Sequence, residues 1–100
     1  MKKILITGGT GSFGEEFLKK FSNKKKFEIS IYSRDEMKQW HLKNGIFKNT
    51  KNFKYILGDI RDKDRLDHAL KGIDYIIHAA ALKIVTTAEE NPIEFIKTNI

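Results

Sequence analysis

Four stretches of the chain are apolar, or alternate between apolar and polar residues, in the manner of buried β-strands. They cover residues 3–7, 27–32, 53–57 and 73–81. The last stretch is apolar through its middle, which predicts a strand that is buried on both faces of a sheet. The segments between these stretches carry helical spacing, so the pattern predicts strands and helices in alternation.

The first predicted helix begins at about Ser12 and carries four apolar residues at helical spacing. They are Phe13, Phe17, Leu18 and Phe21. Because these residues recur on one face of the helix, we expect all of them to pack in the core.

Later helices are predicted from residues that cap helix ends. Asp35 and Asp62 are each expected to accept a hydrogen bond from the first turn of a helix. The first of these helices carries Met37 and Trp40, and the second carries the inward-facing residues Leu66, Ala69 and Leu70 and ends at Gly72. A last helix is expected to begin at Asn91-Pro92 and to continue to Ile100.

Strands that alternate with helices pair in parallel through right-handed crossovers. The predicted fold class is therefore α/β, the N-terminal half of a Rossmann-type doubly wound parallel sheet with strand order 3-2-1-4. We expect residues 1–100 to form this N-terminal portion of one domain. The fourth strand would be left as an open, apolar edge. A ligand crevice would lie between the first and fourth strands, at their carboxyl ends.

Composition narrows the class of partner. The chain has 19 lysines and arginines against 13 aspartates and glutamates, a net charge of +6. The lysines are spread along the chain, so we expect a solvated basic surface and no nucleic-acid partner. With no cysteine and no long apolar run, the sequence predicts a soluble cytoplasmic protein without membrane contact. His41, His68 and His78 lack metal-ligand spacing, so structural or surface roles are expected and no metal site is predicted.

The segment TGGTGSFG, residues 7–14, joins the first predicted strand to the first helix. Gly9, Gly11 and Gly14 have G-x-G-x-x-G spacing, and Gly8 replaces Gly9 in the T-G-x-x-G-x-x-G variant. One glycine permits the tight turn, Gly11 lets backbone approach a phosphate, and Gly14 lets helix and strand pack closely. The free N–H groups and the positive dipole end of the helix would face the anion. The sequence therefore predicts a dinucleotide site here.

The end of the second strand indicates which dinucleotide binds. Ser33 and Arg34 stand about 20 residues beyond the glycine turn, where NAD-binding proteins carry an acidic residue for the ribose 2′-hydroxyl. A hydroxyl and a guanidinium suit a 2′-phosphate, which favours NADP. Asp35 keeps NAD possible.

Two further strand ends carry candidate cofactor contacts. Asp59 is expected to accept a hydrogen bond from an adenine amino group while Ile60 packs on the ring, although Asp59 could instead cap the next helix. After the fourth strand, the small residues Ala79 and Ala80 would admit a flat cofactor, or would simply pack tightly in the sheet.

Five segments together resemble, in order and spacing, the extended short-chain dehydrogenase/reductases. They are residues 7–14, 32–39, 58–62, 78–83 and 91–100. They look most like the inverting UDP-N-acetylglucosamine 4,6-dehydratases of bacterial polysaccharide and flagellin-sugar biosynthesis. The resemblance implies an NADP cofactor, a UDP-sugar substrate and a homo-oligomer when complete. The NADP contacts that it implies are Gly8, Gly11, Ser12, Phe13, Gly14, Ser33, Arg34, Asp59, Ile60, Ala79, Ala80 and Lys83, with Asn99 in support.

The chain departs from that family in two ways. Where the family usually has His and Pro, in a loop beside nicotinamide and sugar, this sequence has Ile84 and Thr86. The family's catalytic Tyr-x-x-x-Lys also does not occur, since none of the three tyrosines is followed four residues later by lysine. We therefore expect no catalytic residue and no substrate-binding part within these 100 residues. A related epimerase, a non-enzymatic NADP-binding module and an inactive truncated product remain alternatives to the dehydratase.

Overall fold

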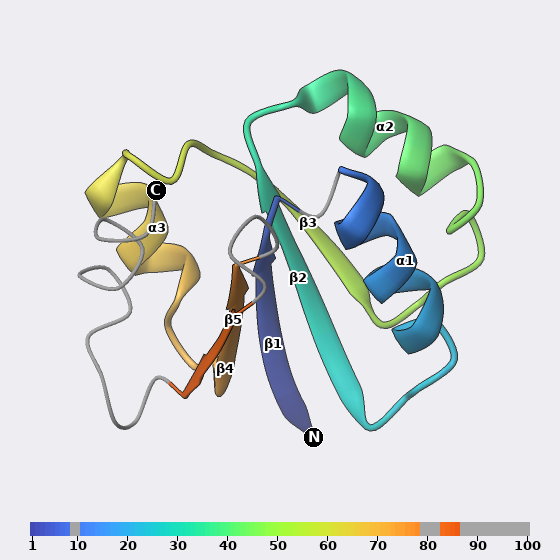
Figure 1. The fold of residues 1–100 in the computed structure, drawn as a ribbon, viewed down its shortest axis with the longest axis horizontal. Helices are drawn as coiled ribbons and strands as arrows, with labels where there is room; N and C mark the ends of the chain where they lie inside the picture. The colour runs from blue at the N-terminus through green and yellow to red at the C-terminus, as the bar shows by residue number, and fades with distance from the viewer. Residues whose placement is uncertain (9–10, 79–82, 87–100) are drawn as a thin grey trace.

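A computed structural model describes residues 1–8, 11–78 and 83–86 of the chain (Figure 1). Its elements in chain order are β1 (Lys2–Thr7), α1 (Ser12–Phe21), β2 (Phe27–Ser33), α2 (Glu36–Asn44), β3 (Phe53–Leu57), α3 (Lys63–Ala69), β4 (Tyr75–His78) and β5 (Lys83–Thr86). The helix expected from Asn91 and the end of the expected fourth strand, residues 79–81, lie outside the described residues.

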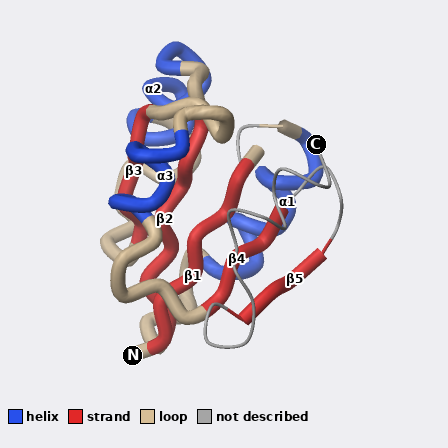
Figure 2. Tube along the Cα trace, turned by 90° about the vertical axis from the view of Figure 1, so that its left-hand side faces the viewer, coloured by secondary structure: helices blue, strands red, loops and turns tan. Residues whose placement is uncertain are grey.

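All described strands form one sheet in the order β3-β2-β1-β4-β5. Strands β1 to β4 pair in parallel, which confirms the predicted α/β class and the order 3-2-1-4. Figure 2 shows the strands in sequence from β3 on the left to β5 on the right. Because β1 lies at the centre of the parallel part, its carboxyl end meets the ends of both β2 and β4.

The expectation of an open edge on the fourth strand was wrong. Strand β5 pairs antiparallel with β4, with Tyr75 opposite Thr86 and His78 opposite Lys83. This return of the chain occupies backbone groups that the edge of β4 would otherwise present for pairing with another chain. The same pairing places Ile84 opposite Ile77 within a strand, where the family resemblance implied a loop.

Helices cover both faces of the sheet, with α1 and α2 on one face and α3 on the other (Figure 1). Alternation along β1 shows why: Ile4 and Ile6 belong to the cluster that contains Leu18 of α1, whereas Leu5 belongs to the cluster that contains Leu66 of α3. Successive side chains of a strand point to opposite faces, so a run of consecutive apolar residues supplies two cores.

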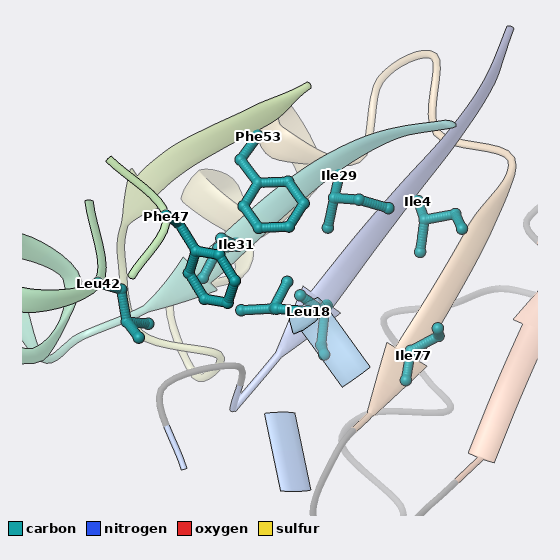
Figure 3. Packing of buried hydrophobic residues seen from close by; sticks show 9 residues of the cluster. Ile4, Leu18, Ile29, Ile31, Leu42, Phe47, Phe53 and Ile77 are labelled. Atoms are coloured by element: carbon teal, nitrogen blue, oxygen red, sulfur yellow. The ribbon is translucent and has the colours of Figure 1, made fainter. Parts of the chain in front are cut away.

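The larger core lies between the sheet and the helices α1 and α2. Figure 3 shows Leu18 among side chains of the sheet, with the rings of Phe47 and Phe53 close together. The centroids of these two rings are 5.1 Å apart in an edge-to-face arrangement. Both rings are buried, so the segment after α2 is bound to the start of β3.

The predicted helix caps are confirmed. The carboxylate of Asp35 accepts a hydrogen bond from the backbone N–H of Lys38 at 3.0 Å, and that of Asp62 accepts one from Arg65 at 3.2 Å. Gly72 follows α3 with φ of +78°, the left-handed conformation that ends helices and favours glycine.

Two local expectations need correction, and the buried face of α2 is an addition. Phe13 is 46% exposed and not in the core, whereas Leu18, farther along the same helix, is fully buried. Strand β4 begins at Tyr75, two residues later than expected. On α2, Met37 and Trp40 are exposed, and the buried residues are Gln39 and Leu42.

Candidate functional site

The glycine turn has the backbone of an anion site. Gly8 follows β1 with φ of +74°, so the chain turns sharply at a position that strongly favours glycine. The backbone N–H of Gly11 donates to the carbonyl of Gly8 at 3.2 Å, which closes the turn. Gly11 is the N-cap of α1, and no side chain caps the helix there. The first amide groups of an α-helix have no partner within the helix, so they face outward from this turn.

A pocket of about 410 Å³ lies beside this turn, at the carboxyl ends of β1, β2 and β3. The described residues that line it are Gly8, Tyr32, Ser33, Arg34, Asp35, Gly58, Asp59, Ile60 and Arg61. Five of these residues were predicted as cofactor contacts from the sequence. The parallel strands bring the five together because their carboxyl ends meet at one edge of the sheet.

Asp59 lies between two arginines in this pocket. Its Oδ2 atom is 2.9 Å from Nη2 of Arg61 and 3.6 Å from Nη1 of Arg34. Its Oδ1 atom also accepts hydrogen bonds from Nε and from the backbone N–H of Arg61. These hydrogen bonds from Arg61, with the charges of both arginines, hold the pKa of the Asp59 carboxyl well below its usual range. The carboxylate is therefore ionised, and it holds both guanidinium groups at the pocket.

The floor of the pocket is Tyr32, whose side chain is fully buried. Its hydroxyl donates a hydrogen bond to the backbone carbonyl of Asp59 at 2.8 Å. Gly58 passes so close to the ring that a Cβ atom on it would lie 2.5 Å from the Tyr32 hydroxyl oxygen. The N–H of Gly58 also donates to the carbonyl of Ser33 at 2.8 Å. The end of β2 and the segment after β3 are thus joined by both side chain and backbone.

A buried hydrogen bond joins the carboxyl ends of the other neighbouring pair, β1 and β4. The Oγ1 atom of Thr7 lies 2.7 Å from Nδ1 of His78, and both residues are almost fully buried. This contact gives His78 a structural partner, as the sequence analysis expected for a histidine at the end of a buried strand. It stabilises the central strands just behind the glycine turn.

The residues predicted to contact the cofactor lie at different places relative to the pocket. Gly8, Ser33, Arg34, Asp59 and Ile60 line the pocket. Gly11 forms the turn beside it, Gly14 is buried within α1, and Phe13 is exposed on the first turn of that helix. Ser12 and Lys83 are placed by their backbone, at the starts of α1 and β5. Ala79 and Ala80 lie outside the described residues.

Three residues of the site were not assigned a role from the sequence. Arg61 holds Asp59, Tyr32 supports the segment after β3, and Gln39 donates from α2 to the end of β2. The sequence carried one signal, the charged Arg61 two residues after Asp59. Tyr32 and Gln39 had none, because their partners are distant in the sequence.

Comparison with known proteins agrees with this architecture. Residues 4–100 match the model of a family described as polysaccharide biosynthesis protein. A UDP-N-acetylglucosamine 4,6-dehydratase (inverting) of Campylobacter jejuni is 54% identical over 99% of this chain, which covers 29% of that enzyme. A UDP-glucose 4-epimerase of Rickettsia bellii is 48% identical, again over 99% of the chain and 30% of the enzyme. The chain thus spans less than a third of the length of these curated relatives.

Solved structures show the same fold. The X-ray structure of Pen from Bacillus thuringiensis superposes with a TM-score of 0.72 at 39% identity, over 99% of this chain and 30% of that one. A short chain dehydrogenase from Bacillus anthracis superposes with a TM-score of 0.66 at 24% identity, over 80% of this chain and 34% of that one, which supports the fold alone. Among the described residues, no helix has the length and apolar character needed to cross a bilayer. With its Rossmann-type sheet, its glycine turn and a family match over almost its whole length, the chain belongs to the polysaccharide biosynthesis protein family.

Proposed function

We propose that this chain is the NADP-binding portion of a nucleotide-sugar 4,6-dehydratase that converts UDP-N-acetylglucosamine to a 4-keto-6-deoxy sugar. The observation that carries the proposal is the pocket, in which Ser33, Arg34 and Asp59 converge beside the glycine turn. The 54% identity to an enzyme of that name, over almost the whole chain, supports the substrate class.

The described residues fit the parts of a dinucleotide. In this proposal the pyrophosphate lies at Gly11 and at the first turn of α1, which Ser12, Phe13 and Gly14 begin. The adenine lies between Ile60 and the carboxylate of Asp59, both of which line the pocket. Ala79, Ala80 and Lys83 follow β4 in the sequence, and the family resemblance assigns them to contacts with NADP.

NADP rather than NAD is favoured by the charges at the end of β2. The Arg34 side chain is 73% exposed and has one ion pair among the described residues, at 3.6 Å, so it is available to a 2′-phosphate. Asp35 already accepts a hydrogen bond from the first turn of α2. One of its two carboxylate oxygens is therefore engaged in capping the helix.

A bound nicotinamide supplies reversible hydride transfer, which suits a reaction that loses water without net oxidation of the sugar. The residues of this chain bind and orient that cofactor. Its sequence has no Tyr-x-x-x-Lys pair, so we infer that the general acid and base come from the remainder of the enzyme. The cytoplasmic location and the homo-oligomer remain predictions.

The 48% identity to a UDP-glucose 4-epimerase supports a second candidate activity. The test is to express the protein from its complete reading frame, add NADP and UDP-N-acetylglucosamine, and analyse the products by mass spectrometry and NMR. We expect a product that has lost the mass of one water. A product of unchanged mass and inverted C4 would identify an epimerase. A protein that binds NADP but turns over neither UDP-N-acetylglucosamine nor UDP-glucose would contradict both activities and favour a non-enzymatic module.

A further inference from the structure

Gln39 of α2 places its side-chain amide beneath the carboxyl ends of two strands. The residue is only 7% exposed, although its helix lies at the surface. Its Nε2 atom lies 2.9 Å from the carbonyl oxygen of Ile56 in β3 and 2.9 Å from the hydroxyl oxygen of Ser33 in β2. The carbonyl oxygens of Ser33 and Ile31 are farther away, at 3.3 Å and 3.5 Å.

These neighbours determine which way the amide points. Three of the four are backbone carbonyl oxygens, which can only accept hydrogen bonds, so the NH₂ group and not the oxygen must face them. The NH₂ group has two hydrogens, and the two shortest contacts take them. The hydroxyl oxygen of Ser33 is therefore an acceptor toward Gln39, and its own proton points elsewhere.

That proton is available to a ligand. Ser33 is partly exposed and lines the pocket beside Arg34. Within the described part of the chain, no acceptor takes the Ser33 hydroxyl proton, since the Gln39 contact uses the oxygen as acceptor. A phosphate group offers only acceptors when it is fully ionised. A ribose hydroxyl can donate as well as accept, so it does not need a donor opposite it.

We propose that Gln39 is a positioning residue that presents the Ser33 hydroxyl to the pocket as a hydrogen-bond donor, and thereby favours a 2′-phosphate over a 2′-hydroxyl on the bound nucleotide. The inference rests on the proposed NADP site and deepens it. It assigns specificity to a buried side chain that touches no ligand. Gln39 acts through Ser33, whereas Arg34 supplies the charge.

The experiment measures the affinity of the complete protein for 2′,5′-ADP and for 5′-AMP, which differ only in the 2′-phosphate, by isothermal titration calorimetry. Ser33→Ala should weaken binding of 2′,5′-ADP by about 10-fold or more and change 5′-AMP binding by less than about twofold, because a hydrogen bond to a charged group is lost. Gln39→Met, of similar volume without a donor, should weaken 2′,5′-ADP by about 3- to 10-fold with the same sparing of 5′-AMP. His41→Met, which places the same side chain at an exposed position of α2, is the matched control.

The double variant separates positioning from packing. If Gln39 acts through the Ser33 hydroxyl, adding Gln39→Met to Ser33→Ala should leave the ratio of the two affinities unchanged. Equal losses of affinity for both nucleotides in Gln39→Met would overturn the proposal. So would a double variant in which Gln39→Met lowers the ratio of the two affinities as much as it does in the parent protein. If Gln39→Met does not fold, Ser33→Ala alone decides: binding of 2′,5′-ADP at the parental affinity overturns the proposal, and a selective loss supports it.

Arg34→Ala distinguishes this inference from the proposed function beneath it. If Arg34→Ala still prefers 2′,5′-ADP to 5′-AMP as strongly as the parent does, the proposed NADP site is itself contradicted. A selective loss with Arg34→Ala, combined with no effect of Ser33→Ala and Gln39→Met, would leave the NADP site in place and overturn only the role of Gln39.

Discussion

In the proposed NADP site, the choice between NADP and NAD depends on Arg34. Its guanidinium forms an exposed pair with Asp59 at 3.6 Å, and solvent screens such pairs so that they contribute little to stability. A 2′-phosphate can therefore recruit Arg34 at little cost to the fold.

We predict that Arg34→Ala lowers the affinity for NADP by about 10- to 150-fold and spares NAD, because only NADP carries the lost charge partner and a charge-assisted hydrogen bond is worth about 1.5 to 3 kcal/mol. Titration calorimetry with both cofactors measures the two affinities. Lys38→Ala, an exposed cation of α2 whose side chain has no ion pair within 4.0 Å among the described residues, is the control. Equal losses of both cofactors would show that Arg34 acts through the structure of the pocket.

The pH dependence of cofactor preference comes from the ligand and not from Asp59. Hydrogen bonds from Arg61 place its folded-state pKa below the ordinary 3.8, so its contribution to stability is present above about pH 4 and is lost as the pH falls through the folded-state pKa. Between pH 5 and 8 its charge is constant. The group that titrates in this window is the 2′-phosphate, whose second pKa is about 6.

The preference for NADP over NAD should therefore rise as the pH increases from 5 to 7.5, since the dianion binds a guanidinium more strongly. Affinities at several pH values measure this slope. Arg34→Ala should flatten it. A preference that does not vary with pH in the parent protein, or an unchanged slope in the variant, would count against a 2′-phosphate beside Arg34.

In the turn between β1 and α1, a substitution at Gly11 should affect ligand binding without affecting the fold. The Gly11 φ of −82° is available to any residue, and a Cβ atom there would lie 3.6 Å from the carbonyl oxygen of Gly8, an ordinary contact. The described part of the fold therefore has room for a side chain at Gly11, whereas the proposed pyrophosphate would not tolerate one.

Gly11→Val should abolish binding of NADP and NAD alike while the far-ultraviolet circular dichroism stays near that of the parent. Glu16→Val, on the exposed side of α1, is the control and should retain both affinities. If Gly11→Val bound either cofactor at the parental affinity, the pyrophosphate would not lie at this turn.

At Gly58, which follows β3, we expect the opposite: a side chain there should disturb the fold as well as binding. A Cβ atom on Gly58 would lie 2.5 Å from the hydroxyl oxygen and 2.6 Å from Cζ of the buried Tyr32 ring, so the backbone or the ring must move. Gly58→Ala should destabilise the protein by about 1 to 3 kcal/mol, as overpacking does. Because the same movement displaces Asp59, affinity for 5′-AMP should fall too.

Thermal unfolding and calorimetry with 5′-AMP measure the two effects of Gly58→Ala. Tyr32→Phe is the control, because it removes the hydrogen bond to the Asp59 carbonyl without a clash and should cost about 0.5 to 1.5 kcal/mol. A Gly58→Ala protein more stable than Tyr32→Phe would mean that the ring has room to move.

For the molecule as a whole, the sheet explains how a short chain forms the proposed cofactor pocket. The lining residues come from the ends of β1, β2 and β3, and the helices α1, α2 and α3 cover both faces of that part of the sheet. Strand β5 protects one edge by pairing with β4. In the proposed assignment, the residues that contact the adenine, Asp59 and Ile60, both belong to the described part of the chain.

We predict that the 100-residue chain, expressed alone, binds 2′,5′-ADP but turns over no UDP-sugar. Binding follows from the pocket, and the lack of turnover follows from the absence of a Tyr-x-x-x-Lys pair in the sequence. Calorimetry and product analysis by mass spectrometry test the two parts, with Arg34→Ala as the control for specific binding. Loss of water from UDP-N-acetylglucosamine in the presence of this chain would contradict the assignment of acid and base to the remainder of the enzyme.

The sequence alone determined those features that depend on near neighbours and on general rules of connection. The caps Asp35 and Asp62 are recognised by side chains that bond three residues ahead, and the glycine turn is recognised by its spacing. The order 3-2-1-4 follows from alternating elements, because right-handed crossovers leave few other arrangements. These features place Ser33 and Arg34 at one edge of the sheet.

The tertiary structure decided what depends on partners far away in the chain. Gly58 lies against the ring of Tyr32, and Gln39 reaches the carbonyl of Ile56, contacts that no local pattern encodes. The pairing of β5 with β4 and the exposure of Phe13 likewise depend on which surfaces meet once the sheet has formed. Residue types and spacing specify the elements and their order, whereas packing in three dimensions alone determines which side chains support the pocket and how their donors and charges are aimed.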